Sequence, residues 1–425
     1  MRHHSYRYRP FHALLNKLMA LQPSVRGTKP TQPLLSIPRK ILVLKFGGMG
    51  EAVLAGSLLT SLKERHPSLQ IDFLVEGRTS DVMNAAGTGK VYSYLPNKDG
   101  LWKAFSILRQ VRRARYDAIV DFEQESLLTA AFVRLSGIPV RLGFSPSAPS
   151  PRSRLFTHLV QLREDKSMWQ LFLQLVRILD PGIPESQQTV PLHYSDSADA
   201  WVKQWRDANG IGEPGNPLIA MHLGVGPSAQ YRRWPMERFL ELANILAERL
   251  PDMFLILTGS SAEQSLIQSF RSSFRGRSVD AADLDELQHT LALLRHCDLM
   301  ISGDTGMMHL SAAMGTPTVG LFGPNSPGCW GPVGPRATYV YGTRLACSPC
   351  INSYKRQIPE KCTAPQEGAC MWDISAEDVL QAAVRVIDPS RIGPLLPQFS
   401  ILPHASLSDH KVSPPDADRL LSKTG

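Results

Sequence analysis

The sequence predicts an α/β protein with two Rossmann-like domains, each built on a parallel sheet with helices on both faces. Short apolar runs alternate with helical patterns from residue 41 to about residue 385, which is the order expected of strand–helix–strand units. A proline-rich segment at residues 181–194 interrupts the alternation once. We therefore expect two similar domains that face each other across an interdomain cleft.

The elements follow in order. In the first half, strands are expected at residues 41–45, 70–75, 91–96, 116–122 and 140–144, with a helix around residues 168–180 before the linker. In the second half, strands are expected at residues 218–224, 253–259, 277–282, 298–303 and 316–323, and the first helix starts at Pro235. The predicted units are a leader at 1–38, domains at 39–195 and 196–388, and a Pro- and Ser-rich disordered tail at 389–425.

Size and charge exclude several classes of protein. The chain has 425 residues, of which 43% are hydrophobic, enough for two or three domains with apolar cores. No uncharged apolar run reaches about 18 residues, so a membrane-spanning helix is not expected. The first 50 residues hold nine Lys or Arg and no acid, which leaves 37 bases (46 − 9) against 38 acids in the remaining 375 residues. The neutral body gives no indication of a nucleic-acid partner.

The basic leader contains a short apolar stretch at residues 11–21. This stretch is compatible with an amphipathic helix on an anionic membrane surface, with a solvated disordered arm, or with a transit peptide. A secretory signal fits poorly, because His12, Asn16 and Lys17 interrupt the apolar run.

A glycine-rich turn follows the first expected strand. It contains Gly47, Gly48 and Gly50, and Glu51 lies in the first turn of the helix that comes next. The acid suits three roles: a helix cap, a group that repels phosphate, or a base. The turn lacks the Lys-Ser/Thr of a phosphate-binding loop and has Val53 where a dinucleotide fingerprint needs glycine. ATP hydrolysis and hydride transfer therefore lose support.

A second turn, at residues 302–309, has the features of an anion site. We expect a strand to end at Ser302, a helix to start at Thr305, and Asp304 to be its N-cap. Gly306 would leave the first turn open to an anion, which backbone N–H groups and the helix dipole would attract. His309 lies four residues after Thr305, so its imidazole would face the same spot.

These two turns carry a family resemblance. The string SGDTGMMHLSAAMGTPTVGLFGP at residues 302–324 resembles the donor-site motif of glycosyltransferase family 9, the ADP-heptose:lipopolysaccharide heptosyltransferases. The segments VLKFGGMGEAVLAGSLLTSLKERHP and YRRWPMERFLELANIL are similar to two further segments of that family, and the likeness extends over most of residues 40–385. It implies a GT-B fold, in which the first domain binds the acceptor and the second binds the nucleotide sugar.

The resemblance also implies roles for single residues. Glu51 stands where the family usually has an aspartate base, in an acceptor-side loop formed by Gly47, Gly48 and Gly50. The family's phosphate-binding lysine corresponds to Arg232, although a one-residue slip would place Arg233 there. On the donor side, the resemblance assigns the nucleotide ribose to Glu263 and the diphosphate to Asp304, Thr305, Gly306 and His309.

This set of residue types suits glycosyl transfer. A carboxylate takes the proton of an attacking sugar hydroxyl, while helix N–H groups and a cation stabilise the leaving diphosphate. One base without a covalent intermediate means inversion at the anomeric carbon. The resemblance further implies that no metal is required. Arginine in place of lysine keeps the positive charge, whereas glutamate in place of aspartate extends the base by one methylene.

Four cysteines cluster near the end of the second domain. Cys347, Cys350, Cys362 and Cys370 have the pattern C-x2-C-x11-C-x7-C, which is compatible with a structural zinc, a disulfide pair or reduced thiols in a loop.

We therefore expect a cytoplasmic glycosyltransferase, associated with the inner face of the cytoplasmic membrane, that moves a heptose from an ADP-sugar to a lipopolysaccharide core-type acceptor. A relative with another nucleotide sugar or glycolipid acceptor is the first alternative. A non-catalytic nucleotide-sugar-binding protein is the second, and an epimerase on the same fold is the third.

Overall fold

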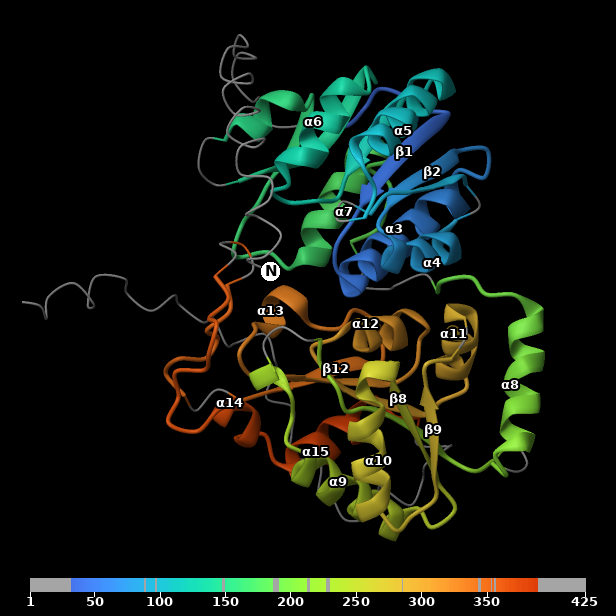
Figure 1. Ribbon diagram of the computed structural model, residues 1–425, viewed down its shortest axis with the longest axis vertical. Coiled ribbons are helices and arrows are strands. Elements are labelled where there is room, and N and C mark those ends of the chain that lie inside the picture. Colours follow the sequence, from blue (N-terminus) through green and yellow to red (C-terminus); the bar gives the residue numbers. More distant parts are fainter. Residues whose placement is uncertain are drawn as a thin grey trace, which may run out of the picture.

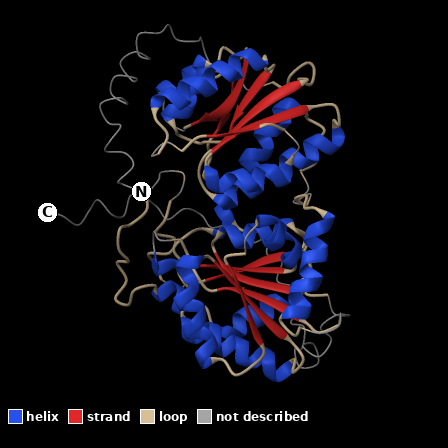
Figure 2. Cartoon of the chain, turned by 45° about the vertical axis from the view of Figure 1, so that its right-hand side comes forward, coloured by secondary structure: helices blue, strands red, loops and turns tan. Residues whose placement is uncertain are grey.

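The computed structural model describes residues 32–388, apart from gaps at 88, 96–97, 147–149, 186–190, 212–214, 227–229, 285, 343–344, 353 and 355–356. Two six-stranded sheets form the described chain, and every strand pair within them is parallel. Helices cover both faces of each sheet (Figure 2). The GT-B architecture of two Rossmann-like domains is thus confirmed.

The first sheet has the strand order β3-β2-β1-β4-β5-β6. Its central strands are apolar on both faces, as a sheet covered on both sides requires; in β1, for example, residues 41–45 are all buried. The strands are β1 (Lys40–Lys45), β2 (Gln70–Val75), β3 (Val91–Ser93), β4 (Ala118–Asp121), β5 (Val140–Ser145) and β6 (His158–Gln161). The helices are α3 (Met49–Arg65), α4 (Gly77–Ala86), α5 (Leu101–Ala114), α6 (Leu127–Leu135), the 3-10 helix η1 (Pro151–Leu155) and α7 (Met168–Leu179).

The second sheet repeats this plan in the order β12-β11-β10-β7-β8-β9. Its strands are β7 (Leu218–His222), β8 (Phe254–Gly259), β9 (Ser278–Ala282), β10 (Leu299–Gly303), β11 (Thr318–Phe322) and β12 (Ala337–Tyr341). Its helices are α8 (Asp196–Ala208), η2 (Gln230–Arg232), α9 (Met236–Arg249), η3 (Ser261–Glu263), α10 (Gln264–Ser273), α11 (Leu287–Arg295), α12 (Gly306–Ala313), α13 (Pro327–Trp330), α14 (Ala369–Trp372) and α15 (Ala376–Val386).

The strand orders show where ligands bind in such sheets. In the first sheet the chain runs outward from β1 and returns to β4, and in the second it runs outward from β7 and returns to β10. Ligands of open α/β sheets bind beyond the carboxyl ends of the strands at such reversals. The turn after β1 and the turn after β10 are the two turns that the sequence singled out.

The two domains pack directly on each other. Helix α3 contacts α12, and α4 contacts α11, so these helices form a shared layer between the sheets (Figure 1). One hydrophobic cluster includes Leu58 and Ile71 of the first domain together with Leu294 and Leu310 of the second. Helices α5 and α6 lie on the far side of the first sheet, away from the second domain (Figure 1).

Two strands were not expected from the sequence. Both β6 and β12 are edge strands, and their burial is incomplete, so they lack the continuous apolar run of a central strand. The apolar stretch at residues 11–21 of the leader and the tail at 389–425 lie outside the described residues. Within the described chain, no helix combines the length and apolar character needed to cross a membrane.

Candidate active site

The glycine-rich turn after β1 presents Glu51 in the first turn of α3. Gly48 is the N-cap of α3 with φ 67°, a left-handed conformation that favours glycine. A side chain at Gly48 would also lie 3.3 Å from Cδ of Glu51. The side chain of Glu51 is 22% exposed, so its carboxylate remains accessible to a ligand.

A buried lysine holds this carboxylate. The ammonium of Lys45, the last residue of β1, is fully buried and lies 2.7 Å from Oε2 of Glu51 and 2.5 Å from Oε1 of Glu123. Burial opposes the charge of Lys45, but the carboxylates of Glu123 and Glu51 outweigh it and raise the pKa of Lys45. Gln124 donates a further hydrogen bond of 3.2 Å to Oε2 of Glu51. Glu51 is therefore oriented by two neighbours.

The neighbouring strand β4 supplies Glu123 and fixes its position. Oε1 of Glu123 accepts hydrogen bonds from the backbone N–H groups of Phe46 (2.9 Å) and Gly47 (3.3 Å). Burial disfavours the charge of Glu123, but Lys45 and these N–H groups lower the pKa of its carboxyl. Behind it, the guanidinium of Arg152 donates to the backbone oxygen of Glu123 and to Asp121. The turn is thus tied to the ends of two adjacent strands.

In the turn after β10, the structure corrects one prediction. Asp304 is not the N-cap: α12 starts at Gly306, its N-cap is the extended residue Thr305, and no side chain caps it. The carboxylate of Asp304 instead accepts a hydrogen bond of 2.7 Å from Asn325 and lies 3.3 Å from Nη1 of Arg232. The reason is that this carboxylate is already engaged by a guanidinium and a carboxamide from two other segments of the second domain.

Two donor atoms beside this turn lack a partner. Nε of Arg232 and Nδ1 of His309 are buried without a hydrogen bond in the described part of the chain. Burial lowers the pKa of His309 to about 4, although Asp304 opposes the shift, so the imidazole is neutral at pH 7. Because buried donors are normally satisfied, these atoms and the free N–H groups of α12 indicate a site for an anion.

The two turns meet at the domain boundary. A Cβ on Gly50 would lie 2.5 Å from Cδ2 of His309, and a Cβ on Gly306 would lie 2.9 Å from Cβ of Met49. Both glycines are therefore required where the N-terminus of α3 meets the N-terminus of α12. Met49 thus fills the space beside the Cα of Gly306, while no side chain caps the N–H groups of α12. The structure brings Glu51 and the anion site together from segments about 250 residues apart.

Glu263 lies at the start of α10 and has a structural contact. Its Oε2 accepts hydrogen bonds from the backbone N–H (2.8 Å) and hydroxyl (2.9 Å) of Ser260. Its Oε1 is 3.8 Å from Nε2 of His222 and faces Gly224, where any side chain would overlap it. One carboxylate oxygen thus closes the capping box of η3, and the other faces His222 and Gly224.

Comparison with known proteins is consistent with this geometry. The family model "Glycosyltransferase family 9 (heptosyltransferase)" matches residues 104–360, more than half of the chain. The chain belongs to glycosyltransferase family 9. Lipopolysaccharide heptosyltransferase 1 of Pseudomonas aeruginosa is 26% identical over 382 residues, which is 86% of this chain and 99% of that protein.

Two solved structures share the fold of this family 9 glycosyltransferase. A glycosyl transferase family 9 protein of Veillonella parvula has a TM-score of 0.66 at 19% identity and covers 82% of this chain and 97% of its own. An Escherichia coli heptosyltransferase solved with ADP-2-deoxy-2-fluoro heptose has a TM-score of 0.58 at 19% identity, covering 81% and 99%.

Several residues of this site were not expected from the sequence. The structure adds Lys45, Glu123 and Gln124 around Glu51, and Asn325 beside Asp304. A signal for the first two was present, because polar residues at the carboxyl ends of adjacent parallel strands lie close together. That β1 and β4 are adjacent is a property of the strand order and is not visible in the linear sequence.

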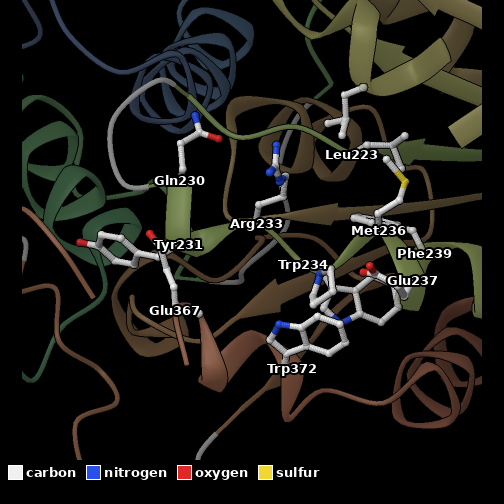
Figure 3. Close-up of a pocket in the computed structure, with 13 residues that line it drawn as sticks. Leu223, Gln230, Tyr231, Arg233, Trp234, Met236, Glu237, Phe239, Glu367 and Trp372 are labelled. Atoms are coloured by element: carbon white, nitrogen blue, oxygen red, sulfur yellow. The ribbon is translucent and has the colours of Figure 1, made fainter. Parts of the chain in front are cut away.

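A separate cavity of about 370 Å³ lies behind the Arg232 segment, and its lining does not include Glu51, Asp304 or His309. Arg233 points into it beside Trp234, Met236 and Trp372 (Figure 3). The two adjacent arginines therefore face different environments. Arg232, and not Arg233, is the one that approaches Asp304.

The cysteine cluster gives no support to the zinc alternative. Cys347, Cys350, Cys362 and Cys370 are all free thiols. Among the described residues, no group of three or more His, Cys, Asp or Glu side chains is arranged to hold a metal ion. Burial raises the pKa of Cys370 to about 11, and the nearby thiols add to the shift.

Proposed function

We propose that this glycosyltransferase moves a heptose, or a related sugar, from an ADP-sugar to a lipopolysaccharide core-type acceptor, with inversion of the anomeric carbon. The observation that carries the proposal is the contact between the N-termini of α3 and α12, which sets a fixed carboxylate next to an anion site. The names of the relatives support the choice of donor and acceptor.

Glu51 is the base of this reaction. It takes the proton of the acceptor hydroxyl as that oxygen forms a bond to the anomeric carbon, and the bond to the diphosphate breaks. Lys45 and Gln124 hold the carboxylate in one orientation. The same ammonium also pairs with Glu123. Gly48 lies against this carboxylate, where a side chain would crowd it.

The donor side stabilises the leaving nucleoside diphosphate. Arg232 and the N–H groups of α12 at Gly306 supply positive charge where negative charge develops. The unpartnered Nδ1 of His309 donates a hydrogen bond to a phosphate oxygen, and Asp304 positions Arg232. Glu263 accepts a ribose hydroxyl at Oε1. Because a cation and a helix N-terminus already serve the diphosphate, we propose that transfer does not require a metal and that EDTA leaves the rate unchanged.

The lipid-linked acceptor places the enzyme at the inner face of the cytoplasmic membrane. Lipopolysaccharide precursors carry acyl chains, so their sugar is presented at a bilayer surface. A peripheral association of the enzyme is then sufficient.

Substitution of the base tests the mechanism. Glu51→Gln should lower kcat by about 100- to 10,000-fold, the contribution of a positioned base, while ADP binding measured by calorimetry is retained. Glu64→Gln is the matched control, because Glu64 is exposed at the other end of α3. A Glu51→Gln enzyme with the wild-type rate would show that another group is the base.

A donor screen tests the substrates. ADP-heptose should yield a product with inverted configuration by NMR, and UDP-sugars should yield none. Binding of ADP without any turnover would favour a nucleotide-sugar-binding protein. Release of an altered free sugar in the absence of acceptor would favour an epimerase.

A further inference from the structure

Helix α5 exposes three large apolar side chains. Leu101, Trp102 and Phe105 are 71%, 85% and 60% exposed among the described residues. They do not contribute to the core, because the opposite face of α5 packs through Ile107 and Val111, which are buried against the first sheet. Exposed aromatic side chains grouped on one helix turn indicate a contact surface.

Positive charge surrounds this apolar group. Residues 98–115 contain six Lys or Arg and one acid, whereas the chain beyond residue 50 has 37 bases against 38 acids. The one acid, Asp99, pairs with Lys103 at 2.7 Å. Lys98, Arg109 and Arg113 are exposed, and the structure shows no ion pair for them within the described residues. The surface is therefore both apolar and cationic.

The start of α5 lies at the edge of the sheet that holds the active site. Helix α5 follows β3, so Leu101 lies toward the carboxyl ends of the parallel strands. Lys45 ends β1 and Glu123 follows β4 at that same edge. The helix is on the outer face of the first domain, away from the second (Figure 1). A surface that docks there would lie at the same edge of the first sheet as Lys45 and Glu123, on the face opposite α3, without covering the donor domain.

We propose that the α5 surface, defined as Lys98, Leu101, Trp102, Phe105, Arg109 and Arg113, docks on an anionic lipid bilayer. Tryptophan and phenylalanine insert at the headgroup level of a bilayer. The cations of the same surface attract anionic lipids. This inference rests on the proposed function in one respect: a lipid-linked acceptor would be presented at the edge where Glu51 lies.

The charge of the surface argues against a second copy of the chain as the partner. A twofold dimer brings the same patch of both subunits together. The unpaired cations of α5 would then face the cations of the other copy, which is unfavourable. An anionic membrane satisfies both the apolar and the cationic part of the surface.

Flotation of the full chain with vesicles tests this proposal. The wild type should bind vesicles that contain phosphatidylglycerol and should not bind pure phosphatidylcholine. Arg109→Gln with Arg113→Gln should weaken binding by roughly 30-fold, because each cation at an anionic surface contributes about a factor of five. Trp102→Ala with Phe105→Ala should weaken it by about tenfold through the lost apolar contact.

Matched variants on the second domain are the controls. Ile358→Ala removes a side chain that is 46% exposed, and Arg271→Gln with Arg275→Gln removes two exposed cations near the end of α10. These variants should bind vesicles like the wild type. If both pairs of α5 variants also bind like the wild type, the α5 surface is not the membrane contact and the proposal fails.

Two further measurements separate this surface from the catalytic proposal. The α5 variants should transfer sugar to a water-soluble, deacylated acceptor at the wild-type rate and should be slower only on acceptor in vesicles. A wild-type enzyme that binds vesicles through α5 but transfers no sugar would contradict the proposed function alone. A dimer in lipid-free solution that the Trp102 and Phe105 changes dissociate would assign the surface to self-association and overturn the membrane proposal.

Discussion

Lys45 carries a full charge into the first domain, where its side chain has no exposed area. Such a charge is tolerated only when opposite charges lie within hydrogen-bond distance. Glu51 and Glu123 meet that condition from α3 and from the end of β4. The consequence for function is that the carboxylate assigned as base has a fixed orientation before any acceptor binds.

His309 shows the opposite case, because this buried titratable group is held in its neutral form. Its imidazole is 4% exposed, and burial lowers its pKa to about 4. In the proposed site, this neutral imidazole would donate one hydrogen bond to a phosphate oxygen and would add no positive charge. This choice leaves the net positive charge of the site to Arg232 and the helix N-terminus.

The pKa of His309 predicts how its contribution to stability changes with pH. The folded pKa of about 4 lies below the value near 6.5 of an unfolded histidine, so acid protonates the unfolded chain first. The stability of the wild type relative to His309→Gln should therefore be constant above about pH 6.5 and should fall by roughly 3 kcal/mol toward pH 4.

Urea unfolding of both proteins between pH 4 and pH 8 measures this difference. Other titrating groups cancel in the comparison, because both proteins contain them. A difference that does not change with pH would show that the His309 imidazole is not held in its neutral form.

At the scale of elements, the central feature is that the N-terminal turns of α3 and α12 pack against each other. The positive ends of the α3 and α12 dipoles point toward the same region, and both favour a negative charge there. The close approach depends on Gly50 and Gly306, since a Cβ at either position would lie under 3.0 Å from the neighbouring helix. The site is thus assembled by two helix termini and not by one loop.

The contact predicts different effects for two substitutions in one turn. Gly50→Ala places a methyl group 2.5 Å from the His309 ring, whereas Gly47→Ala meets no atom within 4 Å. We expect Gly50→Ala to lower kcat/KM by about tenfold or more, because small displacements of reacting groups are costly. Gly47→Ala should stay near the wild-type rate. Equal rates for the two variants would show that the α3–α12 contact is not needed in the active state.

At the scale of the whole molecule, the two domains share one core. A single hydrophobic cluster runs from the first sheet through α3, α4 and α7 into α11 and α12. Tyr354, in the segment between β12 and α14, also donates a hydrogen bond to the backbone oxygen of Lys166 in the first domain. Because much of this apolar surface would be exposed if the domains separated, we expect their stabilities to be linked.

Calorimetry tests this link. The enzyme should unfold in one transition, and ADP at 100 times its Kd should shift the whole transition, since it adds about 2.7 kcal/mol to the stability of the folded state. Two transitions, of which ADP moves only one, would show that the domains unfold independently and that the shared cluster contributes little.

The sequence by itself determined the two-domain α/β architecture, the two turns that carry the site, and the family. Central parallel strands and glycine-rich turns leave a strong local pattern, because the strands are apolar on both faces and the turns restrict residue type. The edge strands β6 and β12 lack that pattern and were missed.

Only the tertiary structure decided the remaining points. It showed that Lys45 pairs with both Glu51 and Glu123, that Asp304 binds Arg232 and Asn325 and does not cap α12, and that Gly50 lies against the His309 ring. It also showed that Leu101, Trp102 and Phe105 of α5 are exposed to solvent. The physical reason is that these contacts join distant segments, and neither strand order nor domain packing is encoded in local periodicity.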